Sequence, residues 1–280
     1  MQLKKITGNK IESFRLYLRA GEKSENTIKK YIRDVTAFAK SRGGAADKSA
    51  VLEYKAELCK KYRPASVNSM LSSLNAFFIF AKMPELCVKT LKIQRRIFAD
   101  RARELTKTDY NKLVAAAKRC GDERLCRLMQ TIGSTGVRIS ELEYITVEAV
   151  RAGRAVVNCK GKIRRILLPS QLCGILKAYA KKRKIKNGAV FVTSSGKPLD
   201  RSNVWKMLKR LCTAAGVAKT RVFPHNFRHL FARTFYAVEK DIVRLADILG
   251  HSSINTTRIY TIETDEIHRQ QIQRLGLLKC

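Results

Sequence analysis

The first 95 residues carry apolar side chains at helical spacing. After Ser24, which suits a helix N-cap, one apolar face runs toward the Gly43-Gly44 pair and consists of Ile28, Tyr31, Ile32, Val35 and Phe38. A second face begins near Pro64 and contains Val67, Met70, Leu71, Leu74, Phe77 and Phe78. Weaker patterns occupy 10–19 and 49–61. The spacing predicts a four-helix domain over residues 1–95.

A charged stretch without apolar periodicity follows, with the sequence KTLKIQRRIFADRAR. We therefore expect a linker at 96–103 and a second domain at 104–280. Thr106 and Asp109 have the spacing of a capping box, which predicts that the second domain opens on a helix. Further helices are expected near 122–134 and 139–145.

Strand patterns appear in the middle of this second domain. Two short β-rich runs, Ala155–Cys159 and Ile163–Leu168, flank Lys160-Gly161-Lys162, which predicts a hairpin. Ala189–Thr193 is expected as a third strand. Helical spacing then returns and is clearest at Ile242, Leu245, Ala246 and Leu249, with Gly250 as the stop. The predicted fold class is mainly α with a small β-sheet, that is, α+β.

The charge balance indicates the class of partner. There are 57 Lys and Arg residues against 23 Asp and Glu, a net charge of +34. Self-repulsion makes such an excess unfavourable, so it is typical of proteins with a polyanionic partner, although a generally basic solvated surface is the alternative. Nucleic acid is favoured over a membrane, because no apolar run approaches the ~20 residues of a membrane span and no amphipathic basic helix stands out. Without a secretory signal, a cytoplasmic protein is expected.

The eight cysteines do not suggest a metal or redox site. Their spacing is irregular, with no CxxC and no neighbouring His pair. We interpret them as free thiols that pack in the interior. The acidic clusters that bind Mg²⁺ in metal-dependent nucleases are not evident either, so no metal or cofactor is expected.

Histidine is scarce and unevenly placed. Three of the four histidines lie in two short motifs, PHNFRH at 224–229 and LGHSS at 249–253, and Tyr260 follows nine residues after His251. Upstream, TGVRISEL places Arg138 two residues after Gly136, at an expected helix start. Singly, such an arginine is usually solvated and such a tyrosine usually packs in a core. Their order is what needs an explanation.

Together these groups suit attack on a phosphodiester. Two guanidiniums, those of Arg138 and Arg228, can each hold a phosphate bidentately and remain charged at any working pH. His225 lies three residues before Arg228, so the two side chains share a helix face. A tyrosine hydroxyl, with a pKa of about 10, becomes a nucleophile when cations stabilise its phenolate and a base takes its proton. A lysine on the hairpin is suited to protonating the leaving oxygen.

The same motifs, in the same order, resemble those of the tyrosine site-specific recombinases, the phage integrase family, in their Xer-like form. That family shows TG-x-R-x-SEL, GKG on a hairpin, PH-x-x-RH, LGH, and a tyrosine nine residues later. This sequence has TGVRISEL, CKGK, PHNFRH, ILGH and Tyr260. The resemblance implies a helical (SAM-like) core-binding, DNA-binding domain at 1–95, a catalytic domain at 104–280 with a C-terminal tail helix, and no ATP requirement.

The resemblance also implies roles for individual residues. Arg138 and Arg228 match the two arginines that hold the scissile phosphate, and Tyr260 matches the nucleophile that forms a 3′-phosphotyrosyl link. His225 corresponds to the residue that assists proton removal from the tyrosine, and His251 to the one that hydrogen-bonds the phosphate. His229 is expected to be structural.

The lysine assignment has two candidates. Lys160 aligns with the family's GKG motif, but Cys159 replaces the first glycine and the hairpin is one residue longer, so Lys162 is the alternative. The resemblance implies double-stranded DNA with specific sites as the partner, a homo-tetramer on that DNA, and service to a mobile element. The tail from Thr264 is expected either to pack on its own domain or to dock on a neighbouring protomer.

Two other functions fit parts of the pattern. A type IB topoisomerase-like enzyme would relax DNA with related chemistry but would not exchange strands between two sites. A catalytically silent DNA-binding protein of the same fold would have lost a phosphate-binding arginine or the tyrosine, and neither is lost here. Site-specific recombination is therefore the favoured function.

Overall fold

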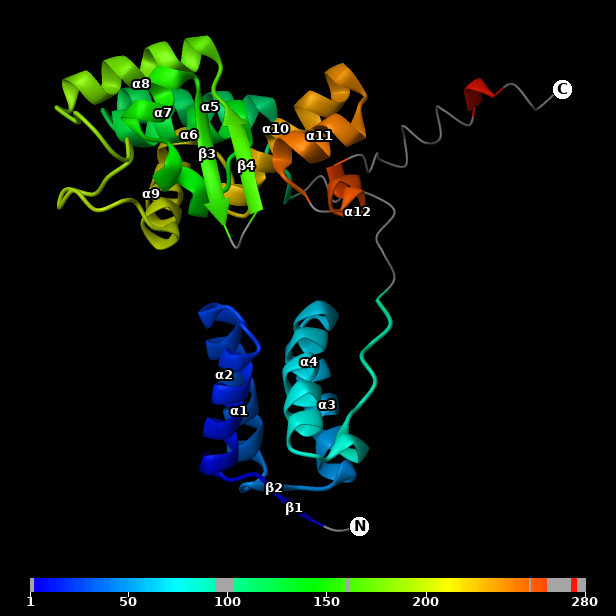
Figure 1. Ribbon diagram of the computed structural model, residues 1–280. Coiled ribbons are helices and arrows are strands. Elements are labelled where there is room, and N and C mark those ends of the chain that lie inside the picture. The colour runs from blue at the N-terminus through cyan, green and yellow to red at the C-terminus, as the bar shows by residue number, and fades with distance from the viewer. Residues whose placement is uncertain (1–2, 94–102, 160–161, 252, 261–272, 276–280) are drawn as a thin grey trace, which may run out of the picture. The chain divides into compact units, whose positions relative to one another are not determined.

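The computed structural model describes residues 3–93, 103–159, 162–251, 253–260 and 273–275 (Figure 1). The chain divides into two compact units, Met1–Arg95 and Arg96–Cys280. No helix in the described ranges is long and apolar enough to cross a membrane.

The first unit contains the four helices that the periodicity predicts. They are α1 (Gly8–Ala20), α2 (Glu25–Ser41), α3 (Lys48–Lys61) and α4 (Pro64–Phe80), accompanied by the two-residue strands β1 (Lys4–Lys5) and β2 (Ala45–Ala46) and the 3₁₀ turn η1 (Pro84–Leu86). The side chain of Ser24 caps α2 as expected, by accepting from the N–H of Thr27. The two apolar faces meet in one core, where Phe14, Phe38 and Phe77 have no exposed surface.

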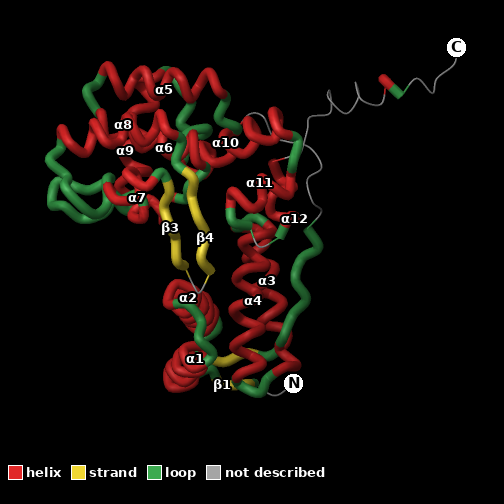
Figure 2. Tube along the Cα trace, turned by 45° about the horizontal axis from the view of Figure 1, so that its top comes forward, coloured by secondary structure: helices red, strands yellow, loops and turns green. Residues whose placement is uncertain are grey.

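The second unit is helical around one β-hairpin. Its helices are α5 (Lys107–Arg119), α6 (Glu123–Thr135), α7 (Val147–Ala152), α8 (Ser170–Lys182), α9 (Arg201–Ala215), α10 (Pro224–Glu239), α11 (Ile242–Leu249) and α12 (Ile254–Thr257), with the 3₁₀ turns η3 (Ile139–Tyr144) and η4 (Arg258–Tyr260). Strands β3 (Arg154–Cys159) and β4 (Lys162–Leu167) pair antiparallel, with Arg154 opposite Leu167 (Figure 2). The α+β prediction is confirmed.

The capping box that opens the second unit is also confirmed. The Thr106 hydroxyl accepts from the N–H of Asp109 at 3.0 Å, and the Asp109 carboxylate accepts from the N–H of Thr106 at 3.2 Å. Two free donors at the start of α5 are thereby satisfied. The main core of this unit then forms between α5, α6, α8, α9 and the buried face of the hairpin.

Three details differ from the sequence predictions. Residues 139–144 form a 3₁₀ turn instead of an α-helix. Ala189–Thr193 is not a strand, and makes only isolated bridges from Ala189 to Thr146 and from Val192 to Pro198. Val190 and Phe191 of this segment are buried. Apolar spacing reports burial, whereas a strand also needs a hydrogen-bonded partner along its length. Of the cysteines, Cys126, Cys173 and Cys212 are buried, but Cys59 and Cys120 are exposed.

Gly136 closes α6 and fixes how the chain leaves that helix. Its φ of +63° lies in the left-handed region, and a Cβ at this position would come within 2.5 Å of the Phe231 ring. Gly153 closes α7 with a φ of +70°, but nothing lies within 4 Å of where its Cβ would be. The two glycines share a conformation and differ in their surroundings.

We therefore expect Gly136→Ala to destabilise the protein more than Gly153→Ala does. Both substitutions place a Cβ at a left-handed φ, which costs about 1 kcal/mol, and Gly136→Ala adds overpacking of about 1–3 kcal/mol. Urea unfolding of the two variants measures the difference in free energy of unfolding. Equal losses would contradict the close packing of α6 against α10.

Candidate active site

Arg138 sits where α6 ends and η3 begins. Its backbone N–H donates to Glu141 Oε2 at 3.0 Å and its Nη1 donates to Glu141 Oε1 at 2.7 Å, so one carboxylate holds both ends of the residue. Its Nη2 donates to the carbonyl of Gly250 at 3.3 Å. The side chain is 37% exposed, so part of the guanidinium still faces solvent.

Arg228 is brought to the same place by α10 and is almost wholly buried, at 1% exposure. Pro224 occupies the first turn of α10, where a missing N–H is harmless, and Arg228 follows one turn later. Its Nη1 donates to the carbonyl of Gly136, and its Nη2 donates to the carbonyl of Leu249 at 2.7 Å. Burial first, and then the charge of Arg138, lower its pKa to about 10, so it remains a cation at neutral pH.

His251 contacts Arg228 directly. The Arg228 Nη2 lies 3.0 Å from His251 Nε2, and His251 Nδ1 lies 2.8 Å from the Thr257 hydroxyl. Because a guanidinium has no acceptor, Nε2 must accept, and the ring proton is therefore on Nδ1. Burial and the nearby cations lower the pKa of His251 to about 4, in agreement with a neutral ring.

Tyr260 lies against these histidines. It belongs to η4, is 4% exposed, and packs with Ala232, Leu245 and Leu249. Its ring is stacked on that of His251, with centroids 6.0 Å apart, and meets the edge of His229 at 4.9 Å. The predicted nucleophile thus lies against His251, the residue that contacts Arg228.

His225 reaches the cluster through His229. The two rings are 4.4 Å apart in an edge contact, and His229 also contacts Tyr260. Desolvation and then the charge of Arg228 lower the pKa of His225, whereas burial lowers the pKa of His229 to about 4. The Nε2 atom of His229 is buried without a hydrogen-bond partner in the described part of the chain. The ring of His229 contacts the rings of both His225 and Tyr260, which agrees with the structural role expected for His229.

Of the six predicted site residues, the structure brings together Arg138, His225, Arg228, His251 and Tyr260. The sixth, Lys160, lies outside the described residues, and for Lys162 the description covers the backbone only. The choice between the two lysines therefore stays a prediction.

A pocket of about 810 Å³ opens in front of the arginines. Arg138, His225 and Arg228 line one part of it, and Arg201, Trp205 and Lys209 of α9 line another. Four arginine or lysine residues line it against two acidic ones, Glu143 and Asp200, so its lining carries a net charge of +2 and favours an anion. Among the residues that the structure describes, no group of three or more His, Cys, Asp or Glu side chains is arranged to hold a metal ion.

Two residues of this site were not predicted from the sequence. Glu141 holds Arg138, and Arg164 of β4 pairs with Glu141 at 3.0 Å. The spacing of Arg138 and Glu141 resembles a capping box, which was a usable signal for Glu141. Arg164 is one of several cations on the hairpin, and no local pattern distinguishes it.

Comparison with known proteins agrees with this geometry. Residues 103–266 match the model of the phage integrase family. The chain belongs to the phage integrase family, the tyrosine recombinases. It is 29% identical to the tyrosine recombinase XerA of Pyrococcus furiosus over 290 residues, which cover 100% of this chain and 98% of that protein. It is 30% identical to a tyrosine recombinase of Agathobacter rectalis over 90% of each chain.

Solved structures share the fold of this recombinase. The Tn1549 transposon integrase in complex with transposon right end DNA superposes with a TM-score of 0.73 at 19% identity, over 95% of this chain and 99% of that one. A lambda integrase dimer bound to a core site gives a TM-score of 0.71 at 17% identity, over 91% and 94%. At these identities the likeness shows the fold alone.

The two histidines whose pKa values are lowered to about 4 make the stability of the recombinase depend on pH. His229 and His251 have pKa values of about 4 when folded, against about 6.5 in an unfolded chain. Between these values the unfolded chain binds more protons, so the free energy of unfolding decreases as the pH falls from about 6.5 to about 4. The melting temperature should fall across this window.

The variant His229→Phe isolates one of the two groups. It keeps an aromatic ring beside Tyr260 but cannot take up a proton, so its melting temperature should fall less steeply over the same window. Carboxylates that titrate near pH 4 act equally in both proteins and cancel in the difference. Parallel curves for the two proteins would contradict the buried, neutral state of His229.

Proposed function

We propose that this recombinase cuts and rejoins double-stranded DNA at specific sites, with Tyr260 as the nucleophile. The single observation that supports the assignment is the chain of contacts from Arg138 and Arg228 through His251 to the Tyr260 ring. The net charge of +34 and the cationic pocket add to it. DNA is bound by two of the structural neighbours, the Tn1549 and lambda integrases.

In the proposed reaction the Tyr260 oxygen attacks phosphorus, and the bond from phosphorus to the 5′ oxygen breaks. The tyrosine proton passes to His225, and the 5′ oxygen takes a proton from Lys160, with Lys162 as the alternative donor. The product is a 3′-phosphotyrosyl ester and a free 5′-hydroxyl. Since one phosphoester replaces another, the bond energy is retained, and a partner strand's 5′-hydroxyl can reverse the step without ATP.

The arginines supply the electrostatic part of this reaction. Arg138 and Arg228 hold donors in a fixed arrangement toward the place where charge develops on the non-bridging oxygens. His251 Nε2 accepts from Arg228 in the protein without DNA, so it has to gain a proton before it can donate to a phosphate. A bound phosphate favours that change, because an anion within hydrogen-bond distance raises the pKa of a histidine.

The alternatives from the sequence are less well supported. A silent DNA-binding protein does not require an intact set of arginines and histidines around a tyrosine, and that set is intact. A topoisomerase-like relaxer shares the chemistry, but the relatives of this chain over its full length are named recombinases. Exchange of strands between two sites is the activity that separates these functions.

A nicked substrate tests the nucleophile. When cleavage releases a short fragment that diffuses away, the covalent protein–DNA complex cannot reverse and accumulates as a shifted band on a denaturing gel. We expect this band for the wild type, in EDTA, and its absence for Tyr260→Phe, which lacks the attacking oxygen. Equal bands for the two proteins would place the nucleophile elsewhere, and a band that needs added Mg²⁺ would contradict the proposed chemistry.

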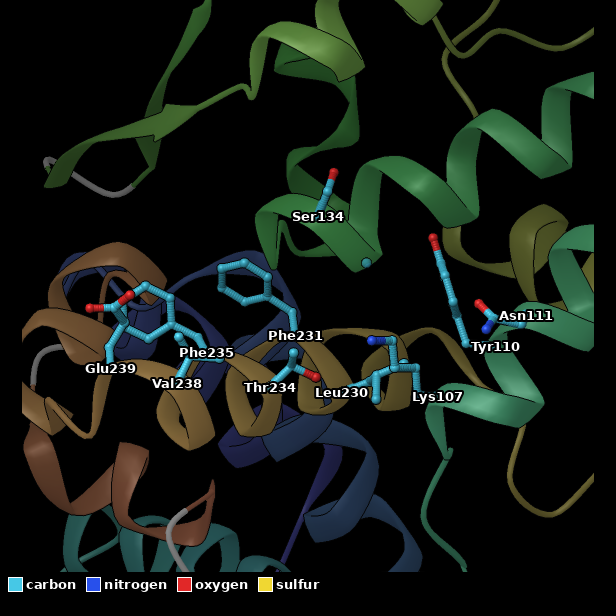
Figure 3. Close-up of a pocket in the computed structure, with 11 residues that line it drawn as sticks. Lys107, Tyr110, Asn111, Ser134, Leu230, Phe231, Thr234, Phe235, Val238 and Glu239 are labelled. Carbon is cyan, nitrogen blue, oxygen red and sulfur yellow. The ribbon is translucent and has the colours of Figure 1, made fainter.

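We further propose that the active assembly is a homo-tetramer in which the C-terminal tail of one protomer docks on the next. An apolar pocket of about 400 Å³ lies between α5, α6 and α10, with Phe231, Phe235 and Val238 along α10 and Tyr110 on α5 (Figure 3). Val238 is 73% exposed, and so is open to a partner. The tail carries Ile267, Ile272, Leu275, Leu277 and Leu278, and Leu275 is itself 63% exposed.

The variant Val238→Asp tests this docking. A carboxylate in the apolar pocket is unfavourable without a partner, so we expect fewer tetramers on paired sites and unchanged binding to a single half-site. Val243→Asp is the matched control, because Val243 is 53% exposed on α11 and does not line the pocket. Sedimentation of the DNA complexes measures both. Equal assembly of the two variants would assign the tail to its own domain.

A further inference from the structure

Arg164 is a largely buried cation that the proposed chemistry does not use. It lies on β4 opposite Val157, in the strand of the hairpin that neighbours α11 (Figures 1 and 2). Its side chain is only 13% exposed, although the chain has many cations that stay in solvent. Burying a guanidinium is unfavourable unless its donors find acceptors, so the contacts of Arg164 need an explanation.

Those contacts are the ones that also hold the two phosphate-binding arginines. Arg164 Nη2 donates to Glu141 Oε2 at 3.0 Å, and the same carboxylate accepts from Arg138. Arg164 Nη1 donates to the carbonyl of Leu249, which also accepts from Arg228. Arg164 therefore shares one anchor with each of the two arginines: Glu141 with Arg138, and the Leu249 carbonyl with Arg228.

Sharing Glu141 changes the charge available to the substrate. Arg138, Arg164 and Glu141 together carry a net charge of +1, whereas Arg138 and Glu141 alone would carry none. In a poorly solvated site an unshared carboxylate attracts Arg138 strongly and competes with a phosphate for its donors. Arg164 thus leaves part of the charge of Arg138 free for an anion.

Arg164 also braces the turn that carries His251. Gly250 has a φ of +60°, and a Cβ there would lie 2.5 Å from Arg164 Cδ. The arginine stem consequently packs directly on the backbone between Leu249 and His251. A shorter side chain would lose both the hydrogen bond to the Leu249 carbonyl and the packing against this turn, and an uncharged side chain would lose the hydrogen bond.

From these contacts we propose that Arg164 is a positioning residue of the recombinase: it balances Glu141 and fixes the Leu249–His251 turn, so that Arg138 and Arg228 keep donors for the scissile phosphate. The inference rests on the proposed function. It is distinct from it, because Tyr260 chemistry does not require any particular residue at position 164.

The test measures the single-turnover rate of covalent complex formation on the nicked substrate, with saturating protein. Arg164→Met is expected to be slower by about 100-fold, the order of loss for a misplaced catalytic group. Arg164→Lys keeps a charge beside Glu141 and should be intermediate. Circular dichroism and the melting temperature establish whether each variant is folded. If Arg164→Met does not fold, the rate of Arg164→Lys is the measurement that tests the proposal.

Two further measurements separate positioning from a general structural effect. Adding Glu141→Gln to Arg164→Met removes the unbalanced carboxylate, so the double variant should be faster than Arg164→Met alone. A substrate with sulfur in place of the bridging 5′ oxygen leaves as a thiolate without needing a proton, since thiol pKa values lie near 8.5. A defect in phosphate binding should persist on it.

The outcomes that overturn the proposal are specific. Wild-type rates for Arg164→Met, no gain in the double variant, or full recovery on the sulfur substrate would each reject it, the last by placing Arg164 with the proton donor. A covalent band for Tyr260→Phe would instead reject the proposed nucleophile. The two failures are therefore distinguishable in the same assay.

Discussion

At the end of helix α11 the carbonyl oxygen of Leu249 has no partner inside the helix, and the two arginines Arg164 and Arg228 donate to it. Helix ends always leave such carbonyls, and the partial negative charge there favours cations. Gly250 makes the sharp exit possible through its left-handed backbone, and the next residue is His251. The arginines, the histidine and the tyrosine of the site all assemble around this turn.

A buried guanidinium must satisfy its donors or destabilise the fold, and this constraint shapes the site. The two Nη atoms of Arg228 meet it with the backbone carbonyls of Gly136 and Leu249 and with a neutral histidine, whereas its Nε is buried without a hydrogen-bond partner among the described residues. Neither carbonyl neutralises its charge, so the cation is held in place by dipoles and its full charge remains for a substrate. Arg138 has a carboxylate partner instead, and that carboxylate is shared with a second cation.

Local pattern was sufficient for most of the fold. Apolar spacing predicted the four helices of the first unit, and the Thr106 capping box, the hairpin and the stop at Gly250 are present as expected. The local pattern gave a wrong prediction at 189–193, where a partly buried apolar segment has the pattern of a strand but no partner strand. It was also wrong at 139–144, where the chain forms a 3₁₀ turn. Both failures concern hydrogen-bond partners. A strand needs a partner that lies far away in the sequence, and a 3₁₀ turn differs from an α-helix by a hydrogen bond to the third residue instead of the fourth.

The sequence by itself was sufficient to predict the chemistry, because TGVRISEL, PHNFRH and LGH, with Tyr260 nine residues later, supply in this order two arginines, titratable rings and a tyrosine. Only the tertiary structure decided which groups share a contact. Glu141 and Arg164 are 23 residues apart, and Arg164 and Leu249 are 85 apart, and one-dimensional spacing carries no information on such pairs. The protonation state of His251 was likewise undecided until the fold placed an obligate donor, Arg228, against its Nε2 atom.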